Sequence, residues 1–191
     1  IDADADRVVA AVAVGATGRL VLIDAASAAV RQTIALPSRP SAVLLVDDQV
    51  VVLLPELGLV TVSWATGGLR TDHAPGLAGA LPSAAARLDA DTLVLSTEQG
   101  GVVWVDRDPE GRWGVVRTEA LEKLHYATGV ATWRGTVHAG TAFSGTLFTW
   151  DDPAQRRVWM AAGTLSSHDD EARLVASPSA LWLPLPFLGA E

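Results

Sequence analysis

The chain repeats a strand-like pattern every 42 to 44 residues, and this period limits the folds open to it more than any other feature. Along the 191 residues, a polar or small residue is followed again and again by a short apolar run. The runs begin at Arg7, Gln49, Asp91, Gly135 and Ser179, which lie 42, 42, 44 and 44 residues apart. A period of this length indicates stacked copies of one supersecondary unit.

Each repeat predicts four short antiparallel strands, here called a, b, c and d, joined by tight turns. In the first four repeats a Gly-containing turn follows strand b, and strand c then ends at Asp24, Trp64, Asp106 and Asp151. These end positions are 40, 42 and 45 residues apart, so a second marker gives the same period. The repeats are assigned to residues 1–38, 39–80, 81–126 and 127–169, with a partial repeat at 170–191.

The predicted b and c strands are almost continuous apolar runs, as at residues 50–54 and 102–105. A strand of this kind is buried on both faces. A two-layer sandwich covers one face of each sheet, whereas sheets stacked face to face around an axis cover both faces of their inner strands. The sequence therefore predicts an all-β fold, a β-propeller with about four blades of four antiparallel strands in one domain.

Two segments resemble known blade signatures. Residues 20–27, LVLIDAAS, resemble the strand-then-turn segment of quinoprotein-like and YVTN-like propeller repeats, in which a strand ends in Asp before a turn of small residues. Residues 147–151, LFTWD, resemble the Trp-Asp ending of WD40-like repeats. The resemblance covers almost the whole chain and implies the blade, with no single chemistry attached to it.

The two ends of the repeat array are incomplete. The first repeat shows strands b, c and d without a, and the last shows only a and b. We expect a segment of a larger ring. Two alternatives stay open: a closed ring of four blades in which residues 173–176 supply the missing strand a, and an all-β fold that is not a propeller.

Seven Trp residues stand out against one Tyr and three Phe. Three in b or c strands are expected to pack between blades: Trp104, Trp150 and Trp182. Four others lie at strand ends or in the outer d strands, where partial exposure makes them candidates for contact with a protein partner. These are Trp64, Trp113, Trp133 and Trp159.

The connections from strand d to the next strand a supply further contact candidates. They hold His73, His125, Tyr126, His168, Asp169, Asp170 and Glu171. Three His on one rim could form a metal or acid–base site, and solvated loop residues are the preferred interpretation. His138, inside a b strand, is interpreted as a hydrogen-bonded structural residue. A short helical turn is expected at residues 119–126. The alternate Asp residues at 2–6 could bind calcium, but a frayed, solvated end is the preferred interpretation of this segment.

Motifs for catalysis or cofactor binding are absent from the sequence. There is no Cys, no Gly-x-Ser-x-Gly and no phosphate-binding loop, so no cofactor or metal is expected. The net charge of −8 argues against nucleic acid as a partner, and no apolar run is long enough for membrane insertion.

We therefore expect a non-enzymatic scaffold whose rim loops contact a protein partner or the remaining part of the propeller, as one component of a multi-protein assembly. The alternatives are an enzyme that uses the rim-loop histidines and a small-ligand sensor. The compartment stays open, with the cytoplasm slightly preferred.

Overall fold

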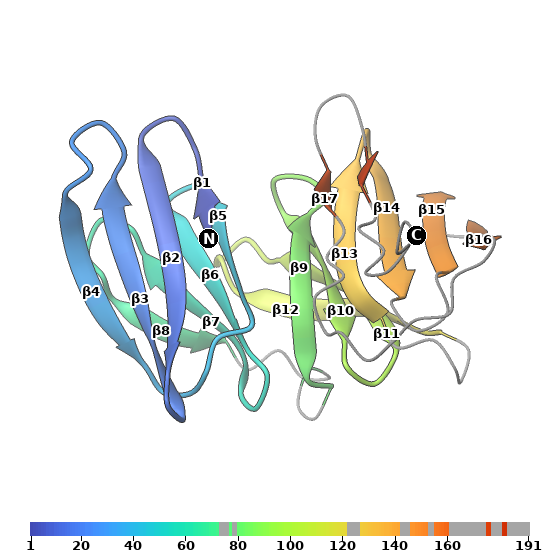
Figure 1. The fold of residues 1–191 in the computed structure, drawn as a ribbon, viewed down its shortest axis with the longest axis horizontal. Helices are drawn as coiled ribbons and strands as arrows, with labels where there is room; N and C mark the ends of the chain where they lie inside the picture. The colour runs from blue at the N-terminus through green and yellow to red at the C-terminus, as the bar shows by residue number, and fades with distance from the viewer. Residues whose placement is uncertain are drawn as a thin grey trace, which may run out of the picture. The chain divides into compact units, whose positions relative to one another are not determined.

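The computed structural model describes residues 1–72, 77, 80–121, 127–141, 146–152, 155–160, 175–176 and 181–182. Every regular element in this part of the chain is a β-strand (Figure 1). The strands form four antiparallel sheets of four strands and one two-stranded pair. Within the same residues, no helix has the length and apolar character needed to cross a membrane. The predicted all-β class with four-stranded units is confirmed.

Neighbours in each sheet are also neighbours in the chain, as expected for a meander. Sheet 1 contains β1 (Asp2–Ala3), β2 (Arg7–Val14), β3 (Thr17–Asp24) and β4 (Val30–Leu36). Sheet 2 contains β5 (Ala42–Val46), β6 (Gln49–Leu54), β7 (Gly58–Ser63) and β8 (Leu69–Asp72). Sheet 3 contains β9 (Pro82–Arg87), β10 (Thr92–Thr97), β11 (Gly101–Arg107) and β12 (Trp113–Ala120). Sheet 4 contains β13 (Ala127–Trp133), β14 (Thr136–Thr141), β15 (Thr146–Asp152) and β16 (Gln155–Met160), and the pair is β17 (Val175–Ala176) with β18 (Leu181–Trp182).

The chain forms two compact units. The first holds Ile1–Pro82 and Arg107–Val115, which means sheets 1 and 2 and the hairpin tip between β11 and β12. The second holds Ser83–Asp106 and Val116–Glu191.

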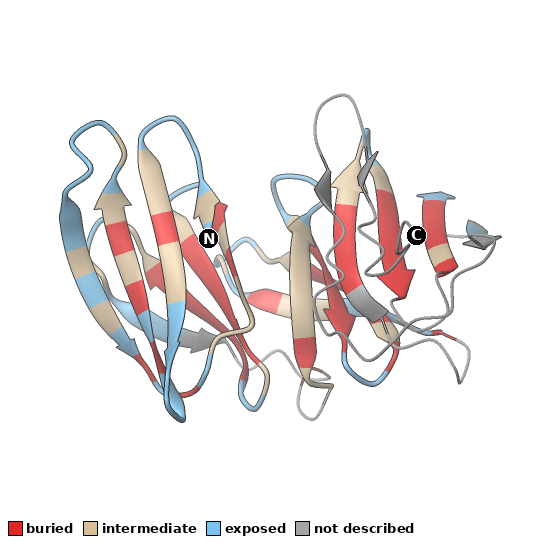
Figure 2. Ribbon diagram, viewed as in Figure 1, coloured by how far each residue is buried: buried red, intermediate tan, exposed pale blue. Residues whose placement is uncertain are grey.

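The core of the first compact unit lies between sheets 1 and 2. Sheet 1 contributes Val9, Leu20, Leu22 and Leu36. Sheet 2 contributes Val43, Leu45, Val50, Val52, Leu54, Val60 and Val62. On β6 and β7 almost every residue is buried (Figure 2), so these inner strands are covered on both faces as their apolar runs predict.

Sheet 1 differs from sheet 2 because burial alternates along its inner strands. Leu20 and Leu22 are fully buried, whereas Val12 and Val14 are 49% and 46% exposed. Side chains of a strand point to opposite faces in turn. One face of sheet 1 therefore packs on sheet 2, and the other is open to solvent.

The start of the chain corrects two expectations. Asp2–Ala3 is paired with β2 and supplies the strand a that the first repeat was expected to lack. The Asp2 carboxylate also accepts a hydrogen bond of 2.7 Å from the backbone N–H of Leu45, and Asp4 Oδ2 accepts one of 2.8 Å from Arg7 Nε. Asp2 and Asp4 are therefore held in place by these bonds, so the expectation of a frayed end is wrong, although residues 3–6 are exposed to solvent as expected.

The core of the second compact unit lies between sheets 3 and 4. It contains Val94, Val102, Trp104, Leu121, Val130, Val137, Ala139, Phe148 and Trp150. The rings of Trp104 on β11 and Trp150 on β15 meet edge to face, with centroids 5.5 Å apart. The predicted packing of these two residues between sheets is confirmed. The predicted helical turn at residues 119–126 is wrong at its start, because Glu119 and Ala120 belong to β12.

Candidate interaction surface

Three of the candidate contact residues have described side chains, and all three lie at the same end of their sheets. In a meander the end of strand a, the start of b, the end of c and the start of d share one edge. Trp64 directly follows strand c of sheet 2, Trp113 opens strand d of sheet 3, and Trp133 closes strand a of sheet 4. Trp159 lies in β16. The other candidates fall outside the described residues: His73, His125, Tyr126, His168, Asp169, Asp170 and Glu171.

Trp64 is partly buried against the core of the first compact unit, and two guanidinium groups lie over its ring. The Cζ atoms of Arg7 and Arg31 are 5.5 and 5.6 Å from the ring centroid. Both distances are within the range of cation–π attraction. The expected partial exposure of Trp64 is confirmed, and the guanidinium groups of Arg7 and Arg31 lie next to its ring.

Arg7 is held by acceptors from two turns. Its Nε donates a hydrogen bond of 2.8 Å to Asp4 Oδ2, and its Nη1 donates to the backbone oxygen of Asp47. Hydrogen bonding from Arg7 is the largest cause that lowers the pKa of Asp4 below its ordinary value. Asp47 occupies the turn between β5 and β6 with φ 53°. Arg7 therefore connects sheet 1 to the first turn of sheet 2.

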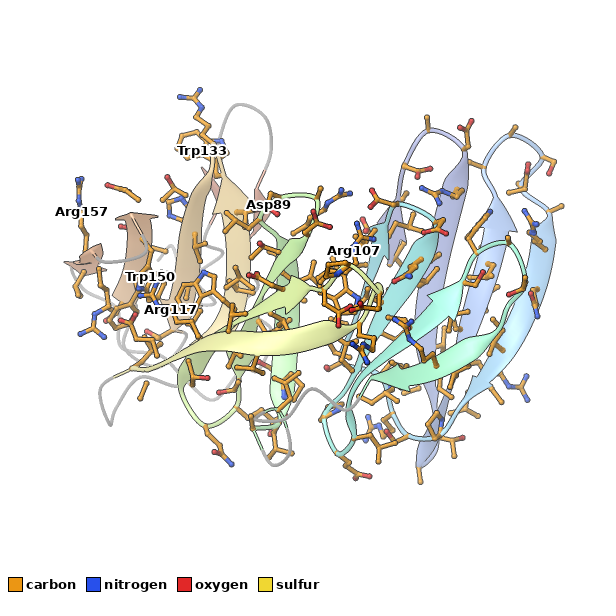
Figure 3. All side chains as sticks on the ribbon, turned by 180° about the vertical axis from the view of Figure 1, so that it is seen from behind. Asp89, Arg107, Arg117, Trp133, Trp150 and Arg157 are labelled. Atoms are coloured by element: carbon orange, nitrogen blue, oxygen red, sulfur yellow. The ribbon has the colours of Figure 1, made fainter. Side chains whose placement is uncertain are left out.

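Asp47 also connects Arg7 to Trp113, the second Trp of the first compact unit. Its carboxylate accepts a hydrogen bond of 2.6 Å from Arg107 Nη2. Arg107 is labelled in Figure 3, and its Cζ atom lies 5.7 Å from the centroid of the Trp113 ring. A continuous line of contacts thus runs from Trp64 through Arg7, Asp47 and Arg107 to Trp113, and we call these five residues the rim line.

The expected exposure of Trp113 is wrong, because this residue is only 3% exposed. Its position at the start of β12 brings the ring beneath Arg107, which ends β11. Its indole N–H is buried and has no hydrogen-bond partner. Within the rim line, Trp64 rather than Trp113 offers ring surface to a partner.

Trp133 lies in the second compact unit and is partly buried, as expected. The turn that follows it has positive φ at Arg134 and Gly135, 52° and 75°, which is the geometry of a two-residue hairpin turn. This turn places the Arg134 Cζ atom 4.5 Å from the centroid of the Trp133 ring. Trp133 and Trp64 therefore share a motif, an indole at a sheet end with a guanidinium over it.

A small polar pocket adjoins the rim line. Its lining residues are Asp48, Gln49, Thr61, Ser63, Gly68 and Arg70. The pocket has a volume of about 110 Å³. A water molecule takes about 30 Å³ in the liquid, and sites for small organic ligands have volumes of about 300–1,000 Å³. The pocket thus has room for a few water molecules, and its size gives no support to the small-ligand sensor.

The described side chains at this end of the sheets can contact a partner, but they do not form a metal site. No three His, Asp or Glu side chains come close enough to hold a metal ion in the part of the chain that the structure describes. The charge-assisted hydrogen bonds of the rim line are made within the protein. What the rim line presents at the surface is the partly exposed indole of Trp64, and Trp is a residue type enriched in protein interfaces.

Reasoning from the sequence missed the arginines of the rim line. Arg7 precedes the first apolar run and Arg107 follows the Asp that ends a c strand, so both occupy marked positions of the repeat. Their acceptor Asp47 is 40 and 60 residues away. The repeat could have singled out the positions, but it carries no signal for the pairing.

Comparison with known proteins identifies the architecture. No protein-family model and no curated protein matches the chain. A crystal structure of BamB from Moraxella catarrhalis matches 95% of this chain with 18% identity and a TM-score of 0.63. The WD40 domain of Pan2 from Neurospora crassa matches 84% of it with 12% identity and a TM-score of 0.64. Selenomethionine-substituted virginiamycin B lyase from Staphylococcus aureus matches 75% with 8% identity and a TM-score of 0.62.

The chain is built of β-propeller blades. Sheets 1 to 4 have the four-stranded antiparallel form of blades, and β17 pairs with β18 as a separate two-stranded sheet. The matches cover 55%, 48% and 49% of the BamB, Pan2 and lyase chains respectively, so this chain spans about half the length of each. The predicted likeness to quinoprotein-like and WD40-like blades is confirmed at the level of fold.

Proposed function

We propose that this chain is a non-enzymatic propeller scaffold that presents the Trp64 end of its blades to a protein partner, as one component of a multi-protein assembly. The observation that carries the proposal is the Trp64 ring, partly exposed between Arg7 and Arg31. Trp and Arg are the residue types most enriched among those that dominate interface energies. Here they stand on packed sheets, so little conformational entropy is lost when a partner binds.

Charge also favours a contact of this kind. The chain carries a net charge of −8, yet arginines gather around Trp64. Arg7 is already paired with Asp4, whereas Arg31 is exposed. Arg31 is therefore the cation that an acidic group of a partner can reach, and charge complementarity of this kind favours specificity more than affinity. We therefore propose a partner that places a carboxylate group against Arg31 and an apolar side chain against the Trp64 ring.

Site-specific photo-crosslinking tests the proposal. Benzoylphenylalanine at position 64 is expected to capture one partner from cells of the source organism. The matched control places the same group at Glu56, which is exposed in the turn at the other end of β7. Capture at position 56 with none at position 64 would move the contact to the other rim and contradict the proposal.

Binding measurements with the captured partner separate contact from folding. Trp64→Ala is expected to weaken binding by at least about tenfold, since truncation of a central interface Trp costs 2 kcal/mol or more. Arg31→Ala removes an exposed side chain, so it leaves the core untouched and should also weaken binding. Unchanged Kd values for both variants would reject Trp64 as the contact.

A further inference from the structure

Sheet 1 has an open face that is apolar. The strand residues on this face alternate with those that point into the core of the first compact unit. We define the outer face by six of them: Ala3, Val8, Ala10, Val12, Val21 and Ile23. None of the six is buried, and Figure 2 shows intermediate and exposed segments that alternate with buried ones along β2 and β3. An apolar sheet face of this extent is unusual on a protein surface without a partner.

The register of the strands shows what the equivalent face does one blade later. In sheet 1, Val8 pairs with Ile23 and Ala10 pairs with Val21. The pairs at the same places in sheet 2, 42 residues after Val8 and Ala10, are Val50 with Val62 and Val52 with Val60. On strand a, Ala3 beside Val8 corresponds to Leu45 beside Val50. Val12 likewise corresponds to Leu54, 42 residues on, so each of the six positions of the outer face has a counterpart in sheet 2.

Those counterparts are covered by a neighbouring blade. Val50, Val52, Val60 and Val62 have no exposed surface. They pack in one cluster with the inward-facing residues of sheet 1. The same positions of the repeat are thus buried by a blade face in sheet 2 and lie open in sheet 1.

We propose that the outer face of sheet 1 is a docking face for one further four-stranded propeller blade, which presents to it an apolar face like the one sheet 1 presents to sheet 2. Continuity with the interface between sheets 1 and 2 supports this occupant. This proposal concerns a different surface from the Trp64 end and does not depend on the proposed function.

Charge argues against a second copy of this chain paired through the same face. The outer side of β3 carries Arg19, which pairs with Val12 in the register. The strand residues on this face of sheet 1 include no carboxylate. Two copies brought face to face would bury like charges without a counter-ion, and burial of unpaired charge is costly. A blade with a polar or acidic residue opposite Arg19 avoids this cost.

A single cysteine reports whether the face is covered, because the chain has none of its own. Val21→Cys places a thiol at the centre of the outer face, and Ala26→Cys places a control thiol in an exposed turn. The further blade is supplied by joining a second copy of residues 1–42 ahead of Ile1, which keeps the 42-residue period. The added copy then offers its own Val9, Leu20 and Leu22 to the outer face.

In the 191-residue chain, both thiols are expected to react with a soluble thiol reagent at similar rates. With the added blade, the rate at position 21 should fall at least about tenfold, because a thiol in a packed interface reacts only when the interface opens. The rate at position 26 should stay the same. A matched control carries Leu20→Asp and Leu22→Asp in the added copy alone and should restore the reaction at position 21.

Three outcomes would overturn the proposal. Unchanged reactivity at position 21 in the extended chain would show that a blade does not fit there. Equal protection by the copy with two Asp residues would show that the covering is not blade packing. Protection that rises with protein concentration in the 191-residue chain would assign the face to a second copy. None of these results bears on crosslinking at Trp64, so the two proposals fail separately.

Discussion

His138 is a buried imidazole on β14 whose two ring nitrogens both lack a hydrogen-bond partner. The expected hydrogen-bonded role is therefore wrong. Burial lowers the pKa of His138 below its ordinary value, and the nearby charge of Asp151 opposes this shift. A buried group that lacks a partner costs free energy, so the imidazole destabilises the fold more when it carries a charge.

This burial makes the stability of the protein depend on pH. The unfolded chain takes up a proton at His138 near the ordinary pKa of about 6.5, whereas the folded chain resists. The free energy of unfolding therefore falls as the pH drops below about 6.5, because protonation of His138 favours the unfolded chain. His138→Leu should flatten this decline in urea denaturation between pH 7.5 and pH 5.5, and should add about 1 kcal/mol at neutral pH by removing an unpaired polar group. Parallel pH curves for the two proteins would contradict this assignment.

The position of single residues in the repeat was predictable, and their partners were not. Trp64 follows strand c as its spacing indicates, and Trp104 packs between sheets as its apolar run indicates. Arg7 finds its acceptor at Asp47, and Asp2 finds its donor at Leu45, 43 residues on. Such pairs depend on which turn lies beside which strand in the folded protein. The sequence around each residue does not specify this arrangement.

At the scale of elements, β12 and the strands of sheet 4 are joined by one carboxylate. Glu119 Oε2 accepts hydrogen bonds from Arg117 Nη2 at 2.6 Å and from Trp150 Nε1 at 3.0 Å. Arg156 Nη1 lies 3.4 Å from the other carboxylate oxygen. The Arg117 guanidinium also lies 4.2 Å from the centroid of Trp104, and Figure 3 shows Arg117 and Trp150 on the same side of the second compact unit. We call Glu119 with Arg117, Trp150 and Arg156 the clasp.

Removing the clasp carboxylate should destabilise the protein measurably. Glu119→Ala removes the acceptor of the Trp150 N–H and of Arg117 Nη2 and takes away an ion-pair partner of Arg156, and leaving buried donors unpaired costs about 1–3 kcal/mol. Glu110→Ala is the matched control, since Glu110 also pairs with an arginine but both side chains are more than 60% exposed. Exposed pairs contribute about 0–1 kcal/mol. Chemical denaturation should rank the losses in this order, and an equal loss in both variants would show that the clasp does not stabilise the packing of β12.

At the scale of the whole molecule, the period and the two-sided apolar runs were enough to predict the architecture. The runs at residues 50–54 and 102–105 lie in β6 and β11. A strand that is covered on both faces is apolar along its whole length, so a continuous apolar run is enough to predict it. The short strand β1 escaped prediction, since Asp2–Ala3 has no apolar signal and is held by pairing with β2. The open face of sheet 1 was equally unpredictable, because burial depends on what lies opposite and not on the residue itself.

The contrast between sheet 1 and sheet 2 predicts that the cost of the same substitution depends on its place in the array. Val52 on β6 has no exposed surface, and Val12 on β2 is 49% exposed. Val52→Ala should lower the free energy of unfolding by about 1.5–3 kcal/mol, since each buried methylene contributes about 0.8 kcal/mol and a cavity adds to the loss. Val12→Ala should cost less than about 0.5 kcal/mol in urea denaturation of the 191-residue chain. Both residues lie on the second strand of their sheets, so the main difference between the two sites is burial. Joining the added copy of residues 1–42 should raise the cost at Val12 toward that at Val52, and equal costs at the two sites without it would contradict the one-sided burial of sheet 1.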